Sequence, residues 1–179
     1  MEINNLFGLP AHPLLVHAPI VLVPLCLLGA VLMAVKPEWR QRFGVPTAVL
    51  AVVAAVSMQL AEGSGEALEE RVRETNLVER HAEIAELAKP FVFLFALALV
   101  AVVGWDLLQR RRARGGDAPE VTGWQATVSR LVPAAMVVTV LLGGVATYEV
   151  VQTGHSGAKA VWDRTPPARE GGEAGEDRD

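Results

Sequence analysis

Cysteine, tyrosine and histidine are scarce in this sequence, and several cofactor-binding patterns are absent from it. The 179 residues include one cysteine, Cys26, so the chain cannot form an internal disulfide. The CxxCH pattern that attaches a c-type haem, the HExxH pattern of zinc peptidases and a glycine-rich phosphate loop are all missing. No nucleophile–base pair is evident, so the sequence leaves open whether the protein is an enzyme.

Apolar residues are abundant, at 51% of the chain with a mean hydropathy of +0.33, while aromatic residues make up only 6%. The excess is alanine, valine and leucine in four blocks, which is typical of membrane helices rather than of one soluble core. A hydrocarbon layer about 30 Å thick requires about 20 helical residues. The sequence therefore predicts an all-α fold, an integral membrane four-helix bundle. Its helices are expected at about residues 13–35, 43–70, 77–108 and 129–153.

The predicted transmembrane domain takes in residues 1–162, and the basic residues indicate its orientation. Lysine and arginine are dense in the loops after the first and third helices, the latter with the run RRRAR at 110–114. Because such loops stay on the cytoplasmic side, both termini are predicted on the outer, periplasmic or extracellular, face of the plasma membrane. Beside a membrane helix this run is a topology signal, so no nucleic-acid partner is expected. Residues 163–179, rich in proline, glycine and charge, are predicted to form a disordered acidic tail.

This topology places all four histidines on the outer side. His12 and His17 lie at the start of the first helix, His81 at the start of the third, and His155 just after the fourth. His17 lies about one turn inside the apolar run, and an ionisable residue there is a functional candidate by default. Each histidine also has an ordinary interpretation: His12 as a helix cap, His17 as a hydrogen-bonding group in the bundle, His81 as a surface residue, and His155 as a loop residue.

Imidazoles from several helices, with carboxylates between them, would form the kind of site that helical bundles build from facing helices. We expect His17 and His155 to bind a cofactor, with His81 as a ligand or partner and His12 in a supporting role. For a metal ion the candidate ligands are His17, His81 and His155. Carboxylates near the outer ends of the helices would orient the imidazoles through hydrogen bonds, namely Glu66, Glu83 and Glu149.

The expected cofactor is a b-type haem or a redox metal that serves electron transfer. A b-type haem needs two axial histidines on opposite faces, whereas zinc, copper or iron would need three or four close ligands. His12 and His17 are five residues apart and would point about 140° away from each other on an ideal helix, which favours haem or a larger site over a compact zinc site. The alternatives are a non-redox transition-metal binding or transport protein, and a structural subunit that docks a redox partner. Expected partners are the lipid bilayer, a redox protein and a second copy of the chain.

Four stretches of the sequence carry a resemblance to a known family, namely GLPAHPLLVHAPIVLVPL, SGEALEE, ERHAEIAE and TGHSGAKAVW. They resemble the bacterial predicted membrane proteins grouped as domain of unknown function 2231. The most specific pattern is the opening His-Pro-x-x-x-His-x-Pro-Ile, and a Gly-His-x-Gly pattern follows the last helix. In this sequence these patterns are His12, Pro13, His17, Pro19 and Ile20, and then Gly154, His155 and Gly157.

The resemblance covers roughly residues 8–162 and implies a membrane protein, without an agreed activity. The layout is also similar to that of four-helix b-type membrane cytochromes, which carry haem between two histidines and pass electrons. That second likeness is an analogy of fold, so the haem remains an expectation to be tested against the site itself.

Overall fold

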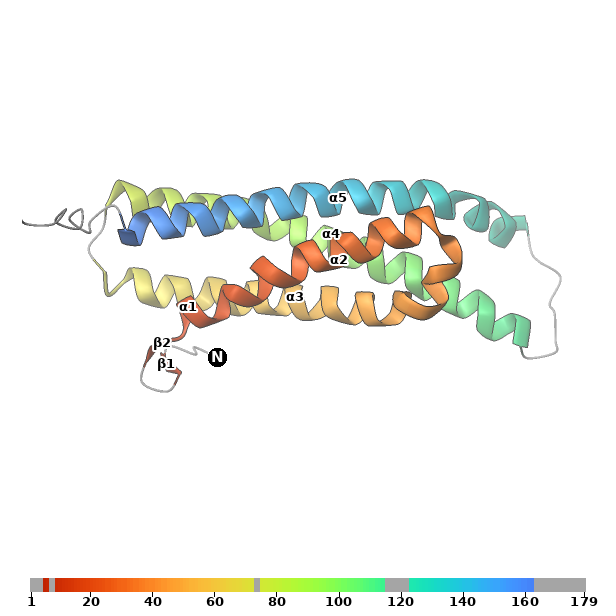
Figure 1. The fold of residues 1–179 in the computed structure, drawn as a ribbon, viewed down its shortest axis with the longest axis horizontal. Helices are drawn as coiled ribbons and strands as arrows, with labels where there is room; N and C mark the ends of the chain where they lie inside the picture. Colours follow the sequence, from red (N-terminus) through yellow and green to blue (C-terminus); the bar gives the residue numbers. More distant parts are fainter. Residues whose placement is uncertain (1–4, 7–8, 73–74, 115–122, 163–179) are drawn as a thin grey trace, which may run out of the picture.

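Four long helices run back and forth along one axis in the computed structural model of this protein (Figure 1). The structure describes residues 5–6, 9–72, 75–114 and 123–162. A two-residue strand pair precedes the first helix, and a short 3-10 turn, Pro37–Trp39, follows the second. The remaining bounds are β1 Asn5–Leu6, β2 Leu9–Pro10, α1 His12–Leu15, α2 His17–Val35, α3 Arg40–Glu69, α4 Asn76–Arg114 and α5 Gly123–Trp162.

Apolar side chains fill the interior of this bundle and also cover much of its outer surface. Phe95 and Leu99 of α4 are fully buried with Met33 of α2, and small alanines fill much of the remaining interior. Leu97 and Leu141, on the outside, are 67% and 65% exposed. Large apolar side chains on the outer surface suit a lipid environment, and all four long helices are long and apolar enough to cross a membrane. The predicted all-α fold of four membrane helices is confirmed.

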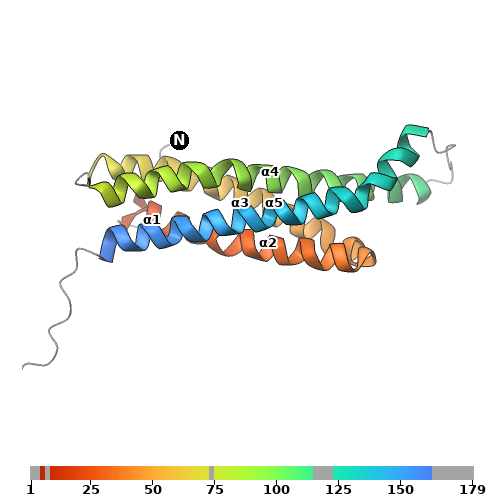
Figure 2. The ribbon, with the colours of Figure 1, turned by 90° about the horizontal axis from the view of Figure 1, so that it is seen from above.

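Each helix packs against two neighbours, so that α2, α3, α4 and α5 form a closed ring (Figures 1 and 2). Small residues allow the close approaches. A Cβ placed on Gly143 of α5 would lie 2.8 Å from Phe95 Cε2, so the Phe95 ring occupies the space that glycine leaves. Each long helix also contains one proline beyond its first turn, which membrane helices tolerate: Pro24, Pro46, Pro90 and Pro133.

The fourth helix extends beyond the end that the sequence indicated. It was expected to end near residue 153, but α5 continues to Trp162, so that His155 is helical rather than part of a loop. Gly154 in this segment lies against Ile20 of α2, where a Cβ would approach Ile20 Cδ1 to 3.2 Å. Packing between α5 and α2 therefore keeps a glycine-containing stretch helical despite its weak helix propensity. The tail expected at 163–179 lies outside the described residues.

Candidate functional site

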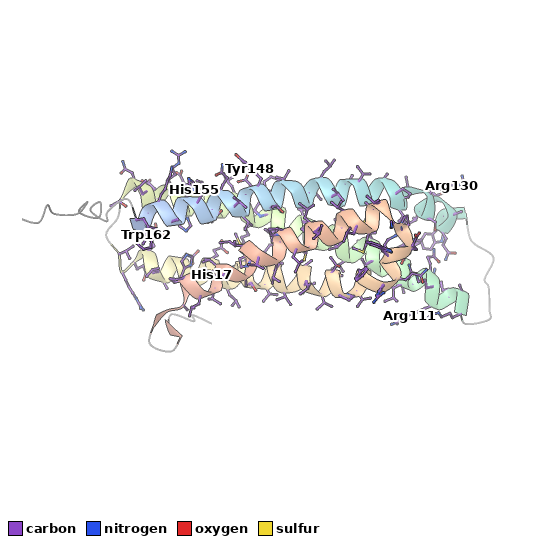
Figure 3. All side chains as sticks on the ribbon, viewed as in Figure 1. His17, Arg111, Arg130, Tyr148, His155 and Trp162 are labelled. Carbon is purple, nitrogen blue, oxygen red and sulfur yellow. The ribbon has the colours of Figure 1, made fainter. Side chains whose placement is uncertain are left out.

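The antiparallel arrangement brings all four histidines to one end of the bundle. His17 and His155 lie toward that end in Figure 3, whereas Arg111 and Arg130 lie toward the other. The starts of α1 and α4 and the ends of α3 and α5 share the first end. We call it the histidine end, after His12, His17, His81 and His155, and the opposite one the arginine end, after Arg110, Arg111, Arg112, Arg114 and Arg130.

Two of the histidines meet in the interior of the histidine end. The ring centroids of His12, from α1, and His81, from α4, lie 6.2 Å apart, with the ring planes at 75°. Both side chains are partly buried. Helices that are far apart in the sequence therefore place two imidazoles beside each other.

The His12 ring is held by α3. Its Nδ1 atom lies 2.8 Å from the Ala61 carbonyl oxygen and 3.4 Å from Ser64 Oγ. Ser64 Oγ in turn donates to the same Ala61 carbonyl at 2.9 Å. Because a carbonyl oxygen can only accept, His12 Nδ1 must carry the proton of this hydrogen bond. In the neutral ring the lone pair is therefore on Nε2.

The His81 ring is held by α5 in a similar way. Its Nδ1 atom lies 3.0 Å from Ser156 Oγ, and Ser156 Oγ donates to the Thr153 carbonyl oxygen at 2.9 Å. The single hydroxyl hydrogen of Ser156 is used in that second bond, so Oγ accepts from His81 and Nδ1 is the donor. His81, like His12, then presents an unprotonated Nε2.

Glycines allow the two rings to lie close to the helix backbones. A Cβ on Gly65 of α3 would lie 3.0 Å from His12 Cε1, and a Cβ on Gly157 of α5 would lie 3.0 Å from His81 Cε1. Both distances are shorter than ordinary van der Waals contact, so either ring would have to move to admit an alanine.

The two ligands expected from the sequence, His17 and His155, lie outside this pair. Both are exposed. His17 Nδ1 donates to the carbonyl oxygen of Pro13, four residues earlier in the chain. The physical reason is helix geometry: a residue five positions from an inward His12 points about 140° away, and a residue next to an inward Ser156 points about 100° away. The structure thus brings together His12 and His81, of which His12 was expected only in support.

The carboxylates expected to orient the imidazoles also lie elsewhere. Glu66 and Glu83 are exposed, and Glu149 is partly buried on α5. The hydrogen-bonding roles expected of them at the two rings are taken by a backbone carbonyl and a serine hydroxyl. Among the residues that the structure describes, no group of three or more histidine, cysteine, aspartate or glutamate side chains is arranged to hold a metal ion.

An ion pair that the sequence analysis did not predict joins α3 and α4 near the site. Lys89 Nζ lies 2.9 and 2.7 Å from the two carboxylate oxygens of Glu62, which also accepts from Gln59 Nε2 at 2.7 Å. Glu62 directly follows Ala61, whose carbonyl oxygen accepts the hydrogen bond from His12, so the Lys89–Glu62 ion pair lies next to that hydrogen bond. Both side chains are partly exposed, at 34% for Lys89 and 26% for Glu62.

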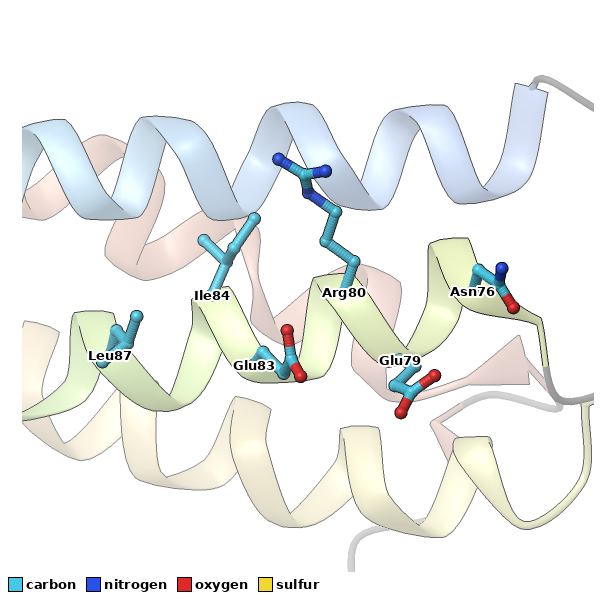
Figure 4. Close-up of a pocket in the computed structure, with 6 residues that line it drawn as sticks. All are labelled: Asn76, Glu79, Arg80, Glu83, Ile84 and Leu87. Atoms are coloured by element: carbon cyan, nitrogen blue, oxygen red, sulfur yellow. The ribbon is translucent and has the colours of Figure 1, made fainter.

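A separate depression lies on one side of α4 (Figure 4). All of its lining residues come from this helix, so it is a feature of the surface rather than an enclosed binding site, and His81 does not line it. The lining residues are Asn76, Glu79, Arg80, Glu83, Ile84 and Leu87.

Ser64, Gly65, Ser156 and Gly157 form part of the site but were not identified as site residues from the sequence. A signal for them exists, because the dipeptide Ser-Gly occurs only twice in the sequence, at 64–65 and 156–157. Both copies lie in the helix that ends a hairpin, α3 or α5. The sequence alone does not show that each copy faces a histidine.

The fold and the site together define a class: a four-helix membrane protein with a pair of partly buried imidazoles at one end of the bundle. The chain belongs to the family described as "Predicted membrane protein (DUF2231)", whose sequence profile matches residues 8–165. This match takes in both histidines of the pair and both Ser-Gly dipeptides, and the resemblance noted from the sequence is confirmed. Comparisons with curated proteins and with solved structures give no significant match.

Proposed function

We propose that this protein binds a b-type haem between His12 and His81 and transfers electrons at the outer face of the plasma membrane. The observation that carries the proposal is the pair itself: two neighbouring imidazoles, each with Nδ1 engaged in a hydrogen bond and Nε2 left to coordinate. Histidines that bind a metal through one nitrogen commonly donate the other N–H to a carbonyl or another fixed acceptor.

The spacing of the rings supports one metal centre between them. Two imidazoles bound through Nε2 on opposite sides of an ion, each nitrogen about 2.0–2.1 Å from it, would have centroids about 6 Å apart. The observed separation is 6.2 Å. A haem supplies four of the six ligands to its iron from the macrocycle, so two protein ligands are sufficient.

The position of the pair along the bundle supports contact with a soluble redox partner. Lys89 and Arg110 of α4 are 21 residues apart and would bracket about 32 Å of helix, close to the thickness of the hydrocarbon layer. His81 precedes Lys89 by eight residues, so its backbone lies about 12 Å beyond that boundary. A cofactor here would lie close to the water at the histidine end. The basic loops lie at the arginine end and favour the cytoplasm, so the histidine end would face the outer side.

The test is an oxidised-minus-reduced absorption spectrum of the full chain, purified in detergent from haem-replete cells, with a haem extraction assay on the same sample. We expect a reducible Soret and α band that His12→Ala and His81→Ala abolish. His17→Ala and His155→Ala are matched controls, because both residues are exposed at the same end of the bundle, and both variants should keep the bands. A colourless, haem-free wild-type protein would overturn the proposal.

A second candidate is a two-coordinate copper(I) site formed by the same two imidazoles. Imidazole is a ligand for copper, and such a site would need no further side chain than these two. Among the described residues no group of three or more histidine, cysteine, aspartate or glutamate side chains is arranged around one ion. Metal analysis of the same preparations separates the two: stoichiometric copper without haem, lost in His12→Ala, would identify a metal-binding or transport protein. Neither haem nor metal would indicate a structural subunit that docks a redox partner.

A further inference from the structure

Each of the two hairpins of the chain contributes the same set of residues to the histidine end. The first hairpin, α1 to α3, begins with His12 and carries Ser64-Gly65 near its end. The second, α4 and α5, carries His81 near its start and Ser156-Gly157 near its end. Every hydrogen bond described above between a histidine and a Ser-Gly segment lies within one hairpin, and the ring contact between His12 and His81 joins the two.

The two sets agree in their atomic contacts. In each, the serine Oγ donates to the carbonyl oxygen three residues earlier at 2.9 Å, from Ser64 to Ala61 and from Ser156 to Thr153. In each, the histidine Nδ1 faces this serine–carbonyl pair. In each, the glycine after the serine lies under the histidine ring, with 3.0 Å between its would-be Cβ and Cε1.

The arrangement of the hairpins makes this agreement meaningful. Both hairpins begin and end at the histidine end, so a rotation about the bundle axis would place one approximately on the other. Membrane proteins built from parallel repeats have their functional site where the repeats meet, around an axis along the membrane normal. The His12–His81 contact is the place where the two halves meet here.

We propose that the histidine end is one site made of two matched halves, in which Gly65 and Gly157 position the two imidazoles for a ligand with two equivalent, opposite coordination positions. This inference rests on the proposed function and narrows the ligand to a centre that takes one imidazole on each side. A centre with three unlike ligands would not use two equal halves.

The positioning role of the glycines follows from steric limits. An alanine at either position would bring a Cβ to 3.0 Å from the ring, and the atom it would meet belongs to a ring that hydrogen bonds already hold. The ring must turn or withdraw, which moves Nε2. Gly63 and Gly144 are matched controls, because a Cβ on either would meet no atom within 4 Å.

The first experiment uses the metal-free and haem-free full chain in detergent, labelled with ¹⁵N-histidine. Nuclear magnetic resonance should show His12 and His81 as Nδ1–H tautomers, the reverse of the form that dominates for histidine in water. Gly65→Ala should shift the His12 signals and Gly157→Ala the His81 signals, while Gly63→Ala and Gly144→Ala shift neither. An Nε2–H tautomer for either ring, or equal shifts in test and control variants, would overturn the inference.

The second experiment measures haem retention in the same variants. Loss of a supporting contact at a metal ligand typically costs 10–100-fold in affinity, and we expect a loss in this range, similar in size, for Gly65→Ala and Gly157→Ala. Circular dichroism confirms that each variant is folded. If an alanine at a glycine position prevents folding, Ser156→Ala provides a milder change, because it removes the oxygen beside His81 Nδ1. If the wild type binds haem but only one of the two glycine variants loses affinity, the inference of two matched halves is wrong. If the wild type binds no haem, the proposed function is wrong, while the resonance experiment still decides the positions of the rings.

Discussion

The two ends of the bundle use their polar residues differently. At the histidine end, polar groups from different helices meet in the interior. His12 of α1 bonds to the Ala61 carbonyl of α3, and His81 of α4 bonds to Ser156 of α5. Such contacts fix the rotation of each helix about its own axis, because a turn of one helix would separate the partners.

At the arginine end, the described polar contacts stay within short stretches of chain. Arg110 pairs with Asp106 one turn earlier on α4, and Lys36 Nζ lies 4.9 Å from the centroid of the Trp39 ring. Contacts of this kind hold side chains at a membrane boundary but leave the rotation of the helices to the apolar core. The histidine end is therefore held by hydrogen bonds between helices, and the arginine end by contacts within one stretch of chain.

Removing one imidazole should cause the greatest change, the loss of the proposed haem or metal binding. His81→Ala should abolish haem or metal binding, since the remaining His12 offers a single ligand, whereas Arg111→Ala at the other end should leave binding unchanged. Bound haem or metal per protein chain, measured after size-exclusion chromatography, checks both. Equal loss in the two variants would erase the distinction between the ends.

A smaller effect is expected when one hydrogen-bond acceptor of the pair is removed. Ser156→Ala takes away the oxygen 3.0 Å from His81 Nδ1, and we expect roughly tenfold weaker binding of the group. Ser64→Ala should have little effect, because His12 keeps the Ala61 carbonyl at 2.8 Å. Titration of the two variants with haem gives the affinity of each relative to the wild type. A larger loss of affinity in Ser64→Ala than in Ser156→Ala would contradict the assigned contacts.

The Lys89–Glu62 ion pair, which joins α4 and α3, should contribute more to stability than the Arg110–Asp106 pair within α4. Lys89→Ala leaves Glu62 without its cation at the membrane boundary and should lower the free energy of unfolding by about 1 kcal/mol, the upper end for partly exposed pairs. Adding Glu62→Gln should recover part of this loss, because the uncompensated charge is removed. Unfolding in a denaturing detergent, followed by circular dichroism, provides the measurement, and an unchanged midpoint for Lys89→Ala would count against the pair.

The smallest effect is expected at the arginine end. Asp106→Ala breaks a pair within one helix, for which about 0.3–0.5 kcal/mol is typical, and it should not alter binding at the histidine end. The same unfolding assay applies. A loss larger than that of Lys89→Ala would reverse the comparison between the two ends.

The sequence supported the helices far better than it supported the site. The four apolar blocks predicted four membrane helices, because each block is long enough to cross the hydrocarbon layer. His155 was expected just after the fourth helix, yet α5 continues through it, and Gly154 and Gly157 lie against Ile20 and His81 there. The choice of His17 over His12 followed from depth in the apolar run, which says nothing about the direction in which a side chain points.

The apolar helices, and the histidines near their ends, could be predicted from the sequence, because length and hydropathy are local properties. Which histidines face each other depends instead on how the helices pack. The rotation of each helix depends on the packing of all four, on close approaches such as Gly143 to Phe95, and on the Ser-Gly dipeptides beside the rings. The His12–His81 pair arises from contacts between residues far apart in the sequence, and a pattern read along one chain does not contain them.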